Sequence, residues 1–261
     1  MSKASLFDSL RLHEEGGVIS IVGAGGKTTL MERLARDIQE RGETVLVTTT
    51  TKILLPSGGP ADQIIIAPQA GDVMKQARPL RAKYRRLTAA CSYLARENKL
   101  VGFPAEEIRA LEKENLFRWI LVEADGARHL PLKAPASHEP VIPPSSRHVI
   151  AVAGLEAIGQ PLTEEWVFRS HLFAAVTGLP PGARITARAV AVALSHAAGI
   201  MKGCPPGACR IVFLNKAETD ERRERGREVV QFLRAMDNGR PNRVIIGALA
   251  REEEPLECHE L

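Results

Sequence analysis

Two kinds of apolar pattern alternate along this chain. Short continuous runs rich in Val and Ile are separated by longer stretches in which apolar residues recur every three or four positions. The longer stretches predict amphipathic helices, the first at about residues 6–12. The short runs predict strands near residues 18–22, 45–48, 64–67, 119–123, 148–153, 211–214 and 244–246. This alternation favours an α/β fold with three layers, in which helices cover both faces of a mainly parallel sheet and ligands bind at the carboxyl ends of the strands.

The connection between the first strand and the next helix has the composition of a phosphate-binding loop. Residues 18–29 read VISIVGAGGKTT, and the following helix keeps its apolar residues at helical spacing until Gly42. Amides of a glycine-rich loop and the positive end of a helix form an anion site, where a lysine reaches outer phosphates and a threonine hydroxyl binds Mg²⁺. The predicted contributors are Gly23, Ala24, Gly25, Gly26, Lys27, Thr28 and Thr29.

The loop departs from the full G-x-x-x-x-G-K-[ST] pattern at one position. Ile21 stands where that pattern requires its first glycine, so the loop has the shortened form G-x-x-G-K-T. Loops of this form resemble the nucleotide loop of the Mur-type amide ligases and those of some divergent phosphate-loop NTPases. Both resemblances imply a bound nucleoside triphosphate.

The strand at 119–123 ends in an acid, as the Walker B element of nucleoside triphosphatases does. Glu123 closes the strand, and Asp125 follows two residues later. A carboxylate in this place holds a Mg²⁺-bound water or orients the attacking water. Glu123 and Asp125 are therefore predicted to be catalytic, and together with Thr28 to form the metal site.

Two further pairs of residues follow strands at the same predicted edge of the sheet. Thr50 and Thr51 come after the strand at 45–48, where hydroxyls can hold Mg²⁺, its waters or the γ-phosphate. Arg128 and Lys133 come after the strand that carries the two acids. Such cations can neutralise transition-state charge, bind an anionic second substrate or remain solvated. We expect both pairs to contact ligand.

A fourth motif follows the strand at 211–214. Asn215, Lys216 and Glu218 have the spacing of N-K-x-D, by which GTPases recognise guanine, except that Glu218 replaces the aspartate. The extra methylene of glutamate alters the two hydrogen bonds that the acid accepts from the base. The motif favours guanine, and an acidic cap on the next helix is the structural alternative. The choice between GTP and ATP stays open.

A basic segment at about 70–116 separates two of the predicted strands. Between residues 76 and 96, apolar side chains recur at helical spacing. The other faces of this stretch carry the basic residues Arg78, Arg81, Lys83, Arg85 and Arg86. A helix with a solvated basic face is the expected structure, and contact with an acidic protein or a phosphorylated small molecule is the alternative.

Composition narrows the class of protein. The 261 residues are 44% apolar, enough for one large core, and no Ser- or Pro-rich linker divides them, so we expect a single domain over 1–261. Scarce aromatic residues and a net charge of +4 argue against a nucleic-acid surface. The four cysteines lack metal-binding spacing. Without a secretory segment or an apolar run of about 20 residues, a cytoplasmic protein with no membrane contact is expected.

These motifs also resemble those of one family. The set GAGGKTT, VTTTTKI, VEADGARHLPLKAP with SHEPVIP, VAGLEAIGQPL with FRSHLF, and FLNKAE is similar to the YqeC family, accessory proteins of selenium-dependent molybdenum hydroxylases. The resemblance spans nearly the whole chain. It implies a phosphate-loop NTPase in the maturation of a selenium-containing molybdenum cofactor, and the same roles for the loop, the two acids and the N-K-x-E segment.

Three functions agree with these residues. The first is Mg²⁺-dependent binding and hydrolysis of GTP or ATP by a maturation factor, with Lys27, Glu123 and Asp125 as catalytic residues. The second is a Mur-like ligase or small-molecule kinase that transfers the γ-phosphoryl group to an acid or cofactor precursor. The third is a nucleotide-gated module that delivers the precursor with little turnover. We favour the first, whose partners are the nucleotide and an anionic cofactor precursor or a hydroxylase maturation protein.

Overall fold

The computed structural model describes the chain apart from residues 1–4, 13–14, 56–62 and 252. Its main element is a nine-stranded sheet in the order β14-β13-β12-β10-β1-β8-β2-β5-β4. All neighbouring strands in this sheet are parallel except β13 and β14. The strands are β1 (Gly17–Gly23), β2 (Val45–Thr49), β4 (Gln63–Ile66), β5 (Arg86–Ala90), β8 (Trp119–Glu123), β10 (Ser146–Gly154), β12 (Cys209–Asn215), β13 (Arg243–Ile246) and β14 (Glu257–Glu260).

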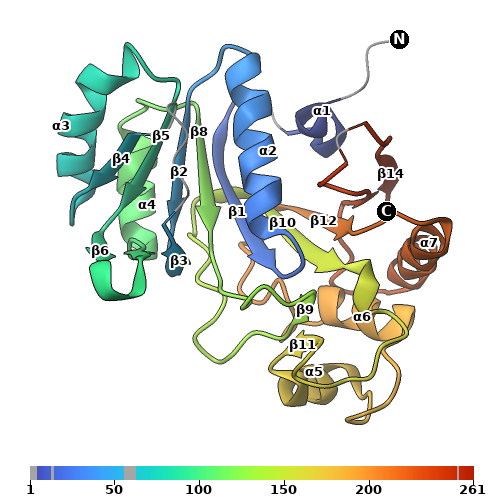
Figure 1. The fold of residues 1–261 in the computed structure, drawn as a ribbon. Coiled ribbons are helices and arrows are strands. Elements are labelled where there is room, and N and C mark those ends of the chain that lie inside the picture. The colour runs from blue at the N-terminus through green and yellow to red at the C-terminus, as the bar shows by residue number, and fades with distance from the viewer. Residues whose placement is uncertain (1–4, 13–14, 56–62, 252) are drawn as a thin grey trace.

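Helices cover both faces of this sheet (Figure 1). They are α1 (Leu6–Leu10), α2 (Lys27–Glu40), α3 (Ala70–Arg81), α4 (Ala105–Lys113), α5 (Ser170–Thr177), α6 (Ala187–Ser195) and α7 (Asp220–Arg234). Because side chains alternate across a strand, Ile19 and Ile21 of β1 pack with α1 and α2, whereas Val18 and Val22 pack on the opposite face with the other helices. The predicted α/β fold, with a mainly parallel sheet between helices, is confirmed.

The seven strands predicted from the apolar runs are all present, as β1, β2, β4, β8, β10, β12 and β13. The first helix is shorter than predicted and ends at Leu10, because Arg11 adopts a left-handed conformation. Helix α2 ends where expected, with Gly42 at a φ of +78° directly after its C-cap residue Arg41. None of the helices in the described ranges is long and apolar enough to cross a membrane.

The helix predicted between residues 76 and 96 is wrong. Helix α3 ends at Arg81, and residues 86–90 form β5, a buried strand between β2 and β4. This strand reads RLTAA, so Leu87 is its only large apolar residue and its sequence shows no clear period of two. Hydrogen bonds to the neighbouring strands on both sides pair the backbone groups of β5. This tertiary context outweighs the helical spacing of its apolar residues. The basic segment therefore contains α3, β5, β6, β7 and α4 instead of continuous helix.

Two small sheets were not predicted. The strands β3 (Lys52–Leu54), β7 (Lys99–Val101) and β6 (Ser92–Leu94) form an antiparallel sheet. The strand β9 (Leu132–Lys133) pairs in parallel with β11 (Val167–Phe168). Strands of two or three residues are too short to show an alternating pattern. In Figure 1, β9, β11 and α5 lie beyond the carboxyl end of β1, where the predicted site residues gather.

Candidate functional site

The predicted phosphate loop joins β1 to α2 at the carboxyl edge of the sheet (Figure 1). Gly25 and Gly26 have φ values of +81° and +130°, which residues with side chains rarely adopt. A Cβ atom at Gly25 would overlap the backbone of Gly154, and one at Gly26 would overlap the side chain of Asn215. The loop therefore needs glycine at both positions, for its backbone shape and for its close packing on β10 and β12.

The backbone amides of the loop fall into two groups. The amides of residues 23–25 donate to other parts of the protein at 2.9–3.0 Å. In α2, the amide of Leu30 donates to the carbonyl of Gly26, and no side chain caps the helix. The amides of residues 27–29 belong to the first turn, where N–H groups lack an intrahelical partner. We therefore expect a phosphate group to use these amides, and not those of Ala24 and Gly25.

Lys27 begins α2 and reaches back to the end of β1. Its Nζ donates to the carbonyl of Gly23 at 2.8 Å and lies 3.3 Å from Asp125 Oδ1 and 3.7 Å from Glu123 Oε1. Glu123 ends β8, which pairs with β1 in parallel, so both acids arrive at the same edge as the loop. All three charged side chains are buried. The structure thus brings together the three residues predicted to be catalytic.

Burial governs the charge of Glu123. Desolvation raises the pKa of this carboxyl above its usual value, and the ammonium group of Lys27 opposes the rise. A carboxylate with a raised pKa is a better proton acceptor from water than one at its ordinary value. Glu123 is therefore a candidate for the group that activates water.

A metal ion fits this site only together with a nucleotide. Within the described ranges, no group of three or more His, Cys, Asp or Glu side chains could hold a metal. Mg²⁺ in phosphoryl-transfer sites needs only one or two carboxylates, because phosphates and water complete its shell. Asp125 Oδ1 is buried without a hydrogen bond, which leaves a free oxygen donor beside Lys27. Together with the buried Glu123 and the exposed Thr28, it would offer the oxygen ligands that Mg²⁺ prefers.

Thr50 and Thr51 lie beside this centre, in the connection after β2. Thr50 Oγ1 donates to the carbonyl of Val141 at 2.7 Å, and the amide of Thr51 donates to Thr49 Oγ1 at 3.0 Å. Thr49 Oγ1 in turn donates to the carbonyl of Glu123 at 2.7 Å. These hydrogen bonds tie the connection to the end of β8, which is a structural role that the sequence patterns did not indicate.

The two predicted cations after β8 have different surroundings. Arg128 is exposed, has a φ of +49°, and places its guanidinium 5.0 Å from the centre of the Phe168 ring. Lys133 is fully buried and pairs with Asp125 Oδ2 at 3.0 Å and with Glu139 Oε2 at 2.8 Å. A ligand can therefore approach Arg128 directly, whereas it reaches Lys133 only by displacing protein groups.

Glu139 and Arg169 extend this group of charges, although no role was predicted for either. Arg169 Nη1 donates to Glu139 Oε2 at 2.5 Å, and its Nη2 donates to Oε1 at 3.2 Å. Burial alone would raise the pKa of Glu139, but its hydrogen bonds with Arg169 and Lys133 lower it to about 2. No spacing in the sequence marks this pairing, because it joins positions 30 residues apart.

The last residue of β12, Asn215, contacts the phosphate loop. Its Nδ2 donates to the carbonyl of Gly25 at 2.7 Å, and its Oδ1 accepts from the amide of Leu249 at 2.9 Å. Glu218 pairs instead with Arg222, four residues along, at 2.8 Å. The asparagine therefore belongs to the site, while an arginine holds the carboxylate that was predicted to bind the base.

Glu156 is a further candidate site residue, which the sequence patterns did not single out. It lies in η2 (Leu155–Ala157), directly after β10 and close to Gly154, which packs on the phosphate loop. Its Oε2 is buried without a hydrogen bond, and burial raises its pKa although the charge of Lys216 opposes the rise. Lys216 has a left-handed backbone, with a φ of +67°. An acid after a strand end, the signal that identified Glu123, is present here too.

The sequence is similar to those of known proteins over most of its length. The family model described as YqeC protein matches residues 19–171. An Escherichia coli (strain K12) protein, named Uncharacterized protein YqeC, is 37% identical over 225 residues that cover 84% of each chain. This chain belongs to the YqeC family. The resemblance inferred from the motifs is confirmed, and the model's match includes the phosphate loop and both acids but ends before Asn215.

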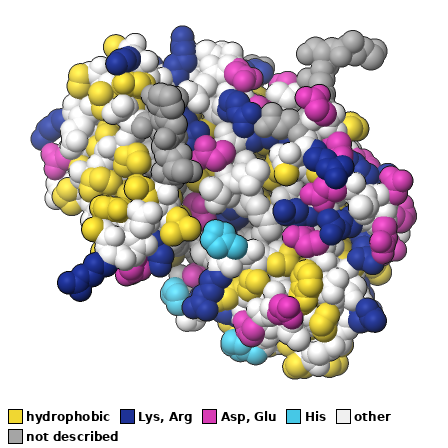
Figure 2. Space-filling view, in the orientation of Figure 1, with side chains coloured by type: hydrophobic (Ala, Val, Ile, Leu, Met, Phe, Trp, Pro, Cys, Tyr) yellow, Lys and Arg dark blue, Asp and Glu magenta, His cyan; other side chains and the backbone are white. Residues whose placement is uncertain are grey.

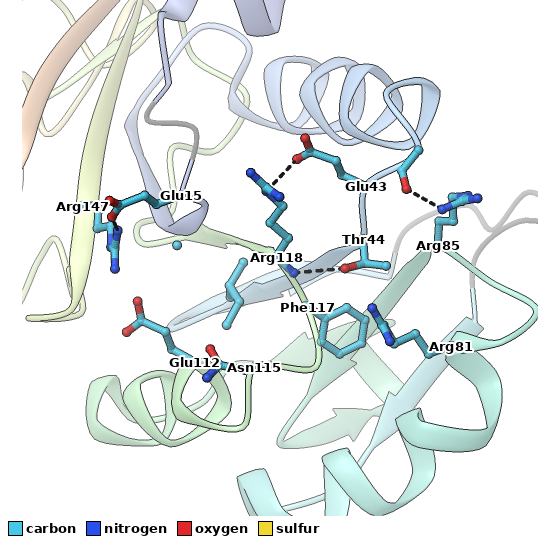
Figure 3. Close-up of a pocket in the computed structure, with 13 residues that line it drawn as sticks. Glu15, Glu43, Thr44, Arg81, Arg85, Glu112, Asn115, Phe117, Arg118 and Arg147 are labelled. Atoms are coloured by element: carbon cyan, nitrogen blue, oxygen red, sulfur yellow. Dashed lines mark hydrogen bonds and ion pairs between the residues drawn. The ribbon is translucent and has the colours of Figure 1, made fainter.

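A cavity of about 490 Å³ in this YqeC family member lies at the opposite, amino edge of the sheet (Figure 3). The C-terminal ends of α2, α3 and α4 line it, and the negative end of a helix dipole favours cations. Arg118 pairs with Glu43 at 3.3 Å, and Arg85 donates to the carbonyl of Gly42. None of the predicted site residues lines the cavity. Arg85, Arg118 and Arg147 all have partners within the protein, so we assign the cavity no ligand.

Proposed function

We propose that this protein binds a nucleoside triphosphate together with Mg²⁺ and hydrolyses it. The contact of Lys27 with Glu123 and Asp125 at the start of α2 carries this proposal. A lysine in this place supplies positive charge for the outer phosphates, and the carboxylates beside it hold a metal ion or orient the attacking water. The parallel pairing of β1 and β8 supports it, because this pairing delivers the three side chains to one edge.

In this proposal the residues act mainly by positioning. The amides of residues 27–29 and the positive end of α2 receive phosphate oxygens, and Lys27 exchanges its contact with Gly23 for a contact with the outer phosphates. Bound Mg²⁺ supplies neutralisation of phosphate charge. Asp125 and the Thr28 hydroxyl would hold the ion, and Glu123 would take the proton from the attacking water.

We also propose that hydrolysis serves, in the cytoplasm, the maturation of the cofactor of a selenium-dependent molybdenum hydroxylase. The support is the resemblance of the EADGA and HEPVIP segments to the YqeC family, whose model match includes both. The partner in this role is an anionic cofactor precursor or a maturation protein of the hydroxylase.

Guanine is the base that we propose. The carboxylate of Glu218 can accept from N1 and N2 of guanine, whereas adenine offers an acceptor at N1. In the structure Glu218 is paired with Arg222 at 2.8 Å, so guanine has to compete with this ion pair. We therefore expect GTP to be preferred to ATP by a smaller margin than an unpaired carboxylate would give.

Transfer of the γ-phosphoryl group to an acid is a second candidate. Arg128 and Arg169 both lie over the Phe168 ring, at 5.0 and 4.3 Å from its centre. Figure 2 shows histidine and basic side chains on the surface beyond the end of β8. The exposed members after β8 and on α5 are Arg128, His129, His138 and His171. A carboxylate or phosphate acceptor bound to Arg128 would contact the same connection that carries Asp125.

One experiment tests both candidates. The purified protein is incubated with Mg²⁺ and GTP or ATP, with and without carboxylate- or phosphate-bearing acceptors, and the γ-phosphate is followed. Free phosphate without an acceptor supports hydrolysis, and a phosphorylated or ligated acceptor supports transfer. Tight nucleotide binding without either product contradicts both and favours a delivery module. The variant Lys27→Ala, measured in parallel, shows whether the turnover comes from this site.

A further inference from the structure

The ammonium group of Lys133 is paired within the protein and not open to a ligand. An ammonium group has three N–H donors, and three acceptors surround Lys133 Nζ. They are the carbonyl of Gly126 at 2.6 Å, Glu139 Oε2 at 2.8 Å and Asp125 Oδ2 at 3.0 Å. The side chain is fully buried. Its charge is therefore directed at the two carboxylates, although the sequence led us to expect a ligand contact.

The contact with Lys133 determines the orientation of the Asp125 carboxylate. Its Oδ2 lies 3.0 Å from Lys133 Nζ and accepts a hydrogen bond from the amide of Gly23, also at 3.0 Å. Its Oδ1 is buried without a hydrogen bond and lies 3.3 Å from Lys27 Nζ. Rotation of the carboxylate would move Oδ2 away from both the Gly23 amide and the Lys133 ammonium group. One hydrogen bond and one ion pair on the same oxygen thus keep the other oxygen directed at the phosphate loop.

Lys133 is itself held in place by Glu139. The carboxylate of Glu139 contacts Lys133 on one side and the guanidinium of Arg169 on the other, and that guanidinium lies 4.3 Å from the centre of the Phe168 ring. The four charges in order from Asp125 to Arg169 alternate in sign, so each buried charge has an opposite partner. Buried ions are tolerated in proteins only when they are paired in this way.

We propose that Lys133 is a positioning residue. Anchored by Glu139, it holds Asp125 Oδ2 so that Oδ1 faces Lys27 and the space for the outer phosphates. The effect of this arrangement on turnover rests on the proposed function. The orientation of Asp125 does not, because it can be measured in the absence of nucleotide.

The amide of Gly23 reports this orientation, because it donates to Asp125 Oδ2. Its hydrogen exchange is measured by NMR in the ¹⁵N-labelled full chain, and the amide of Ile21, in the middle of the same strand, is the internal reference. Exchange at an amide slows when its hydrogen bond is stable. Loss of the hold on Asp125 should therefore speed exchange at Gly23 and leave Ile21 unchanged.

Two variants separate positioning from general stability. Glu139→Gln removes the charge but keeps a side-chain oxygen that can accept from Lys133, so Lys133 stays available to Asp125 and this variant serves as the matched control. The double variant Lys133→Met with Glu139→Gln removes the contact without leaving an unpaired charge at position 139. Arg188→Ala, which removes an exposed cation from α6, controls for the loss of a positive charge remote from Asp125, since the net charge of the double variant is unchanged.

In the double variant we expect the protection of Gly23 to fall about tenfold or more, and that of Ile21 to change by less than about twofold. Both controls should keep wild-type protection at Gly23. With Mg²⁺ and nucleotide, kcat of the double variant should fall about tenfold while KM stays within about threefold, because Lys133 contacts no phosphate.

Unchanged protection of Gly23 in the double variant overturns the proposal, as does an equal loss in Glu139→Gln alone. A parallel loss at Gly23 and Ile21 also overturns it, since that result indicates general destabilisation. If the double variant does not fold, Lys133→Leu with Glu139→Gln, which likewise removes every side-chain donor at position 133, is judged by the same criteria. A wild-type protein without turnover contradicts the proposed function, and the exchange data then still decide the role of Lys133.

Discussion

Asn215 Nδ2 and the carbonyl oxygen of Gly25 lie 2.7 Å apart, although 190 positions separate the two residues in the sequence. The same buried side chain accepts from the amide of Leu249 at 2.9 Å. One asparagine therefore joins the phosphate loop, the end of β12 and the segment after β13. Its position links the N-K-x-E segment to the backbone of the loop.

Replacing Asn215 should weaken the fold and the binding of every nucleotide. In Asn215→Ala the carbonyl of Gly25 and the amide of Leu249 lose a buried partner, which should lower the free energy of unfolding by about 2–4 kcal/mol. GTP and ATP affinities should fall by the same factor. Urea unfolding and nucleotide titration measure the two effects, with the exposed Asn238→Ala as control. A loss confined to one nucleotide would show that Asn215 recognises the base instead.

Lys27 is the cation closest to the predicted positions of the outer phosphates. Lys27→Ala should weaken triphosphate binding by about tenfold or more, because charge-assisted contacts contribute about 1.5–3 kcal/mol. Circular dichroism should show an intact fold. Lys113→Ala, at the exposed end of α4, is the matched control. Unchanged nucleotide affinity and turnover in Lys27→Ala contradict the assignment of the site.

Asp125 should be needed for turnover more than for binding. Asn at position 125 keeps an oxygen for the Gly23 amide but loses the negative charge, so Asp125→Asn should retain nucleotide and cut hydrolysis by about a hundredfold. The rate is measured at saturating Mg²⁺, with Asp237→Asn on the surface as control. Wild-type turnover in Asp125→Asn would remove this residue from the mechanism.

The choice of base should depend on Glu218. Competition titrations should show GTP binding more tightly than ATP, and Glu218→Ala should abolish that difference. Arg222→Ala should widen it by about tenfold, because removal of the 2.8 Å ion pair frees the carboxylate to accept from guanine. Equal affinities in the wild type, or an ATP preference that survives Glu218→Ala, would mean that the segment is an ordinary turn between strand and helix.

Glu139 should make stability depend on pH in the acid range. Its pKa falls from 4.5 to about 2 on folding, because its hydrogen bonds with Arg169 and Lys133 outweigh the effect of burial. A lowered carboxyl pKa stabilises the fold above pH 4.5, and the contribution of about 3 kcal/mol is lost as the pH falls toward 2. The difference in unfolding free energy between wild type and Glu139→Gln should be larger at about pH 6 than at about pH 3. A constant difference would show that the charge of Glu139 does not matter.

The sequence by itself determined the central strands and the ends at which chemistry is expected. A parallel strand with helices on both faces is apolar at nearly every position, so runs such as residues 18–22 are recognisable without their neighbours. Parallel strands also bring their carboxyl ends to one edge. This rule was enough to predict that Lys27, Glu123 and Asp125 would meet.

Only the tertiary structure decided that residues 86–90 form a strand, which groups the loop amides bind and what surrounds Lys133. Residues 86–90 are a strand because β2 and β4 lie on either side of them. The amide of Ala24 donates to a carbonyl of β10, and the amide of Gly25 donates to a carbonyl in the connection after β8. Lys133 is buried because Asp125 and Glu139 surround it. Local spacing encodes the periodicity of a helix or strand, whereas burial and charge pairing depend on groups that meet only when distant segments fold together.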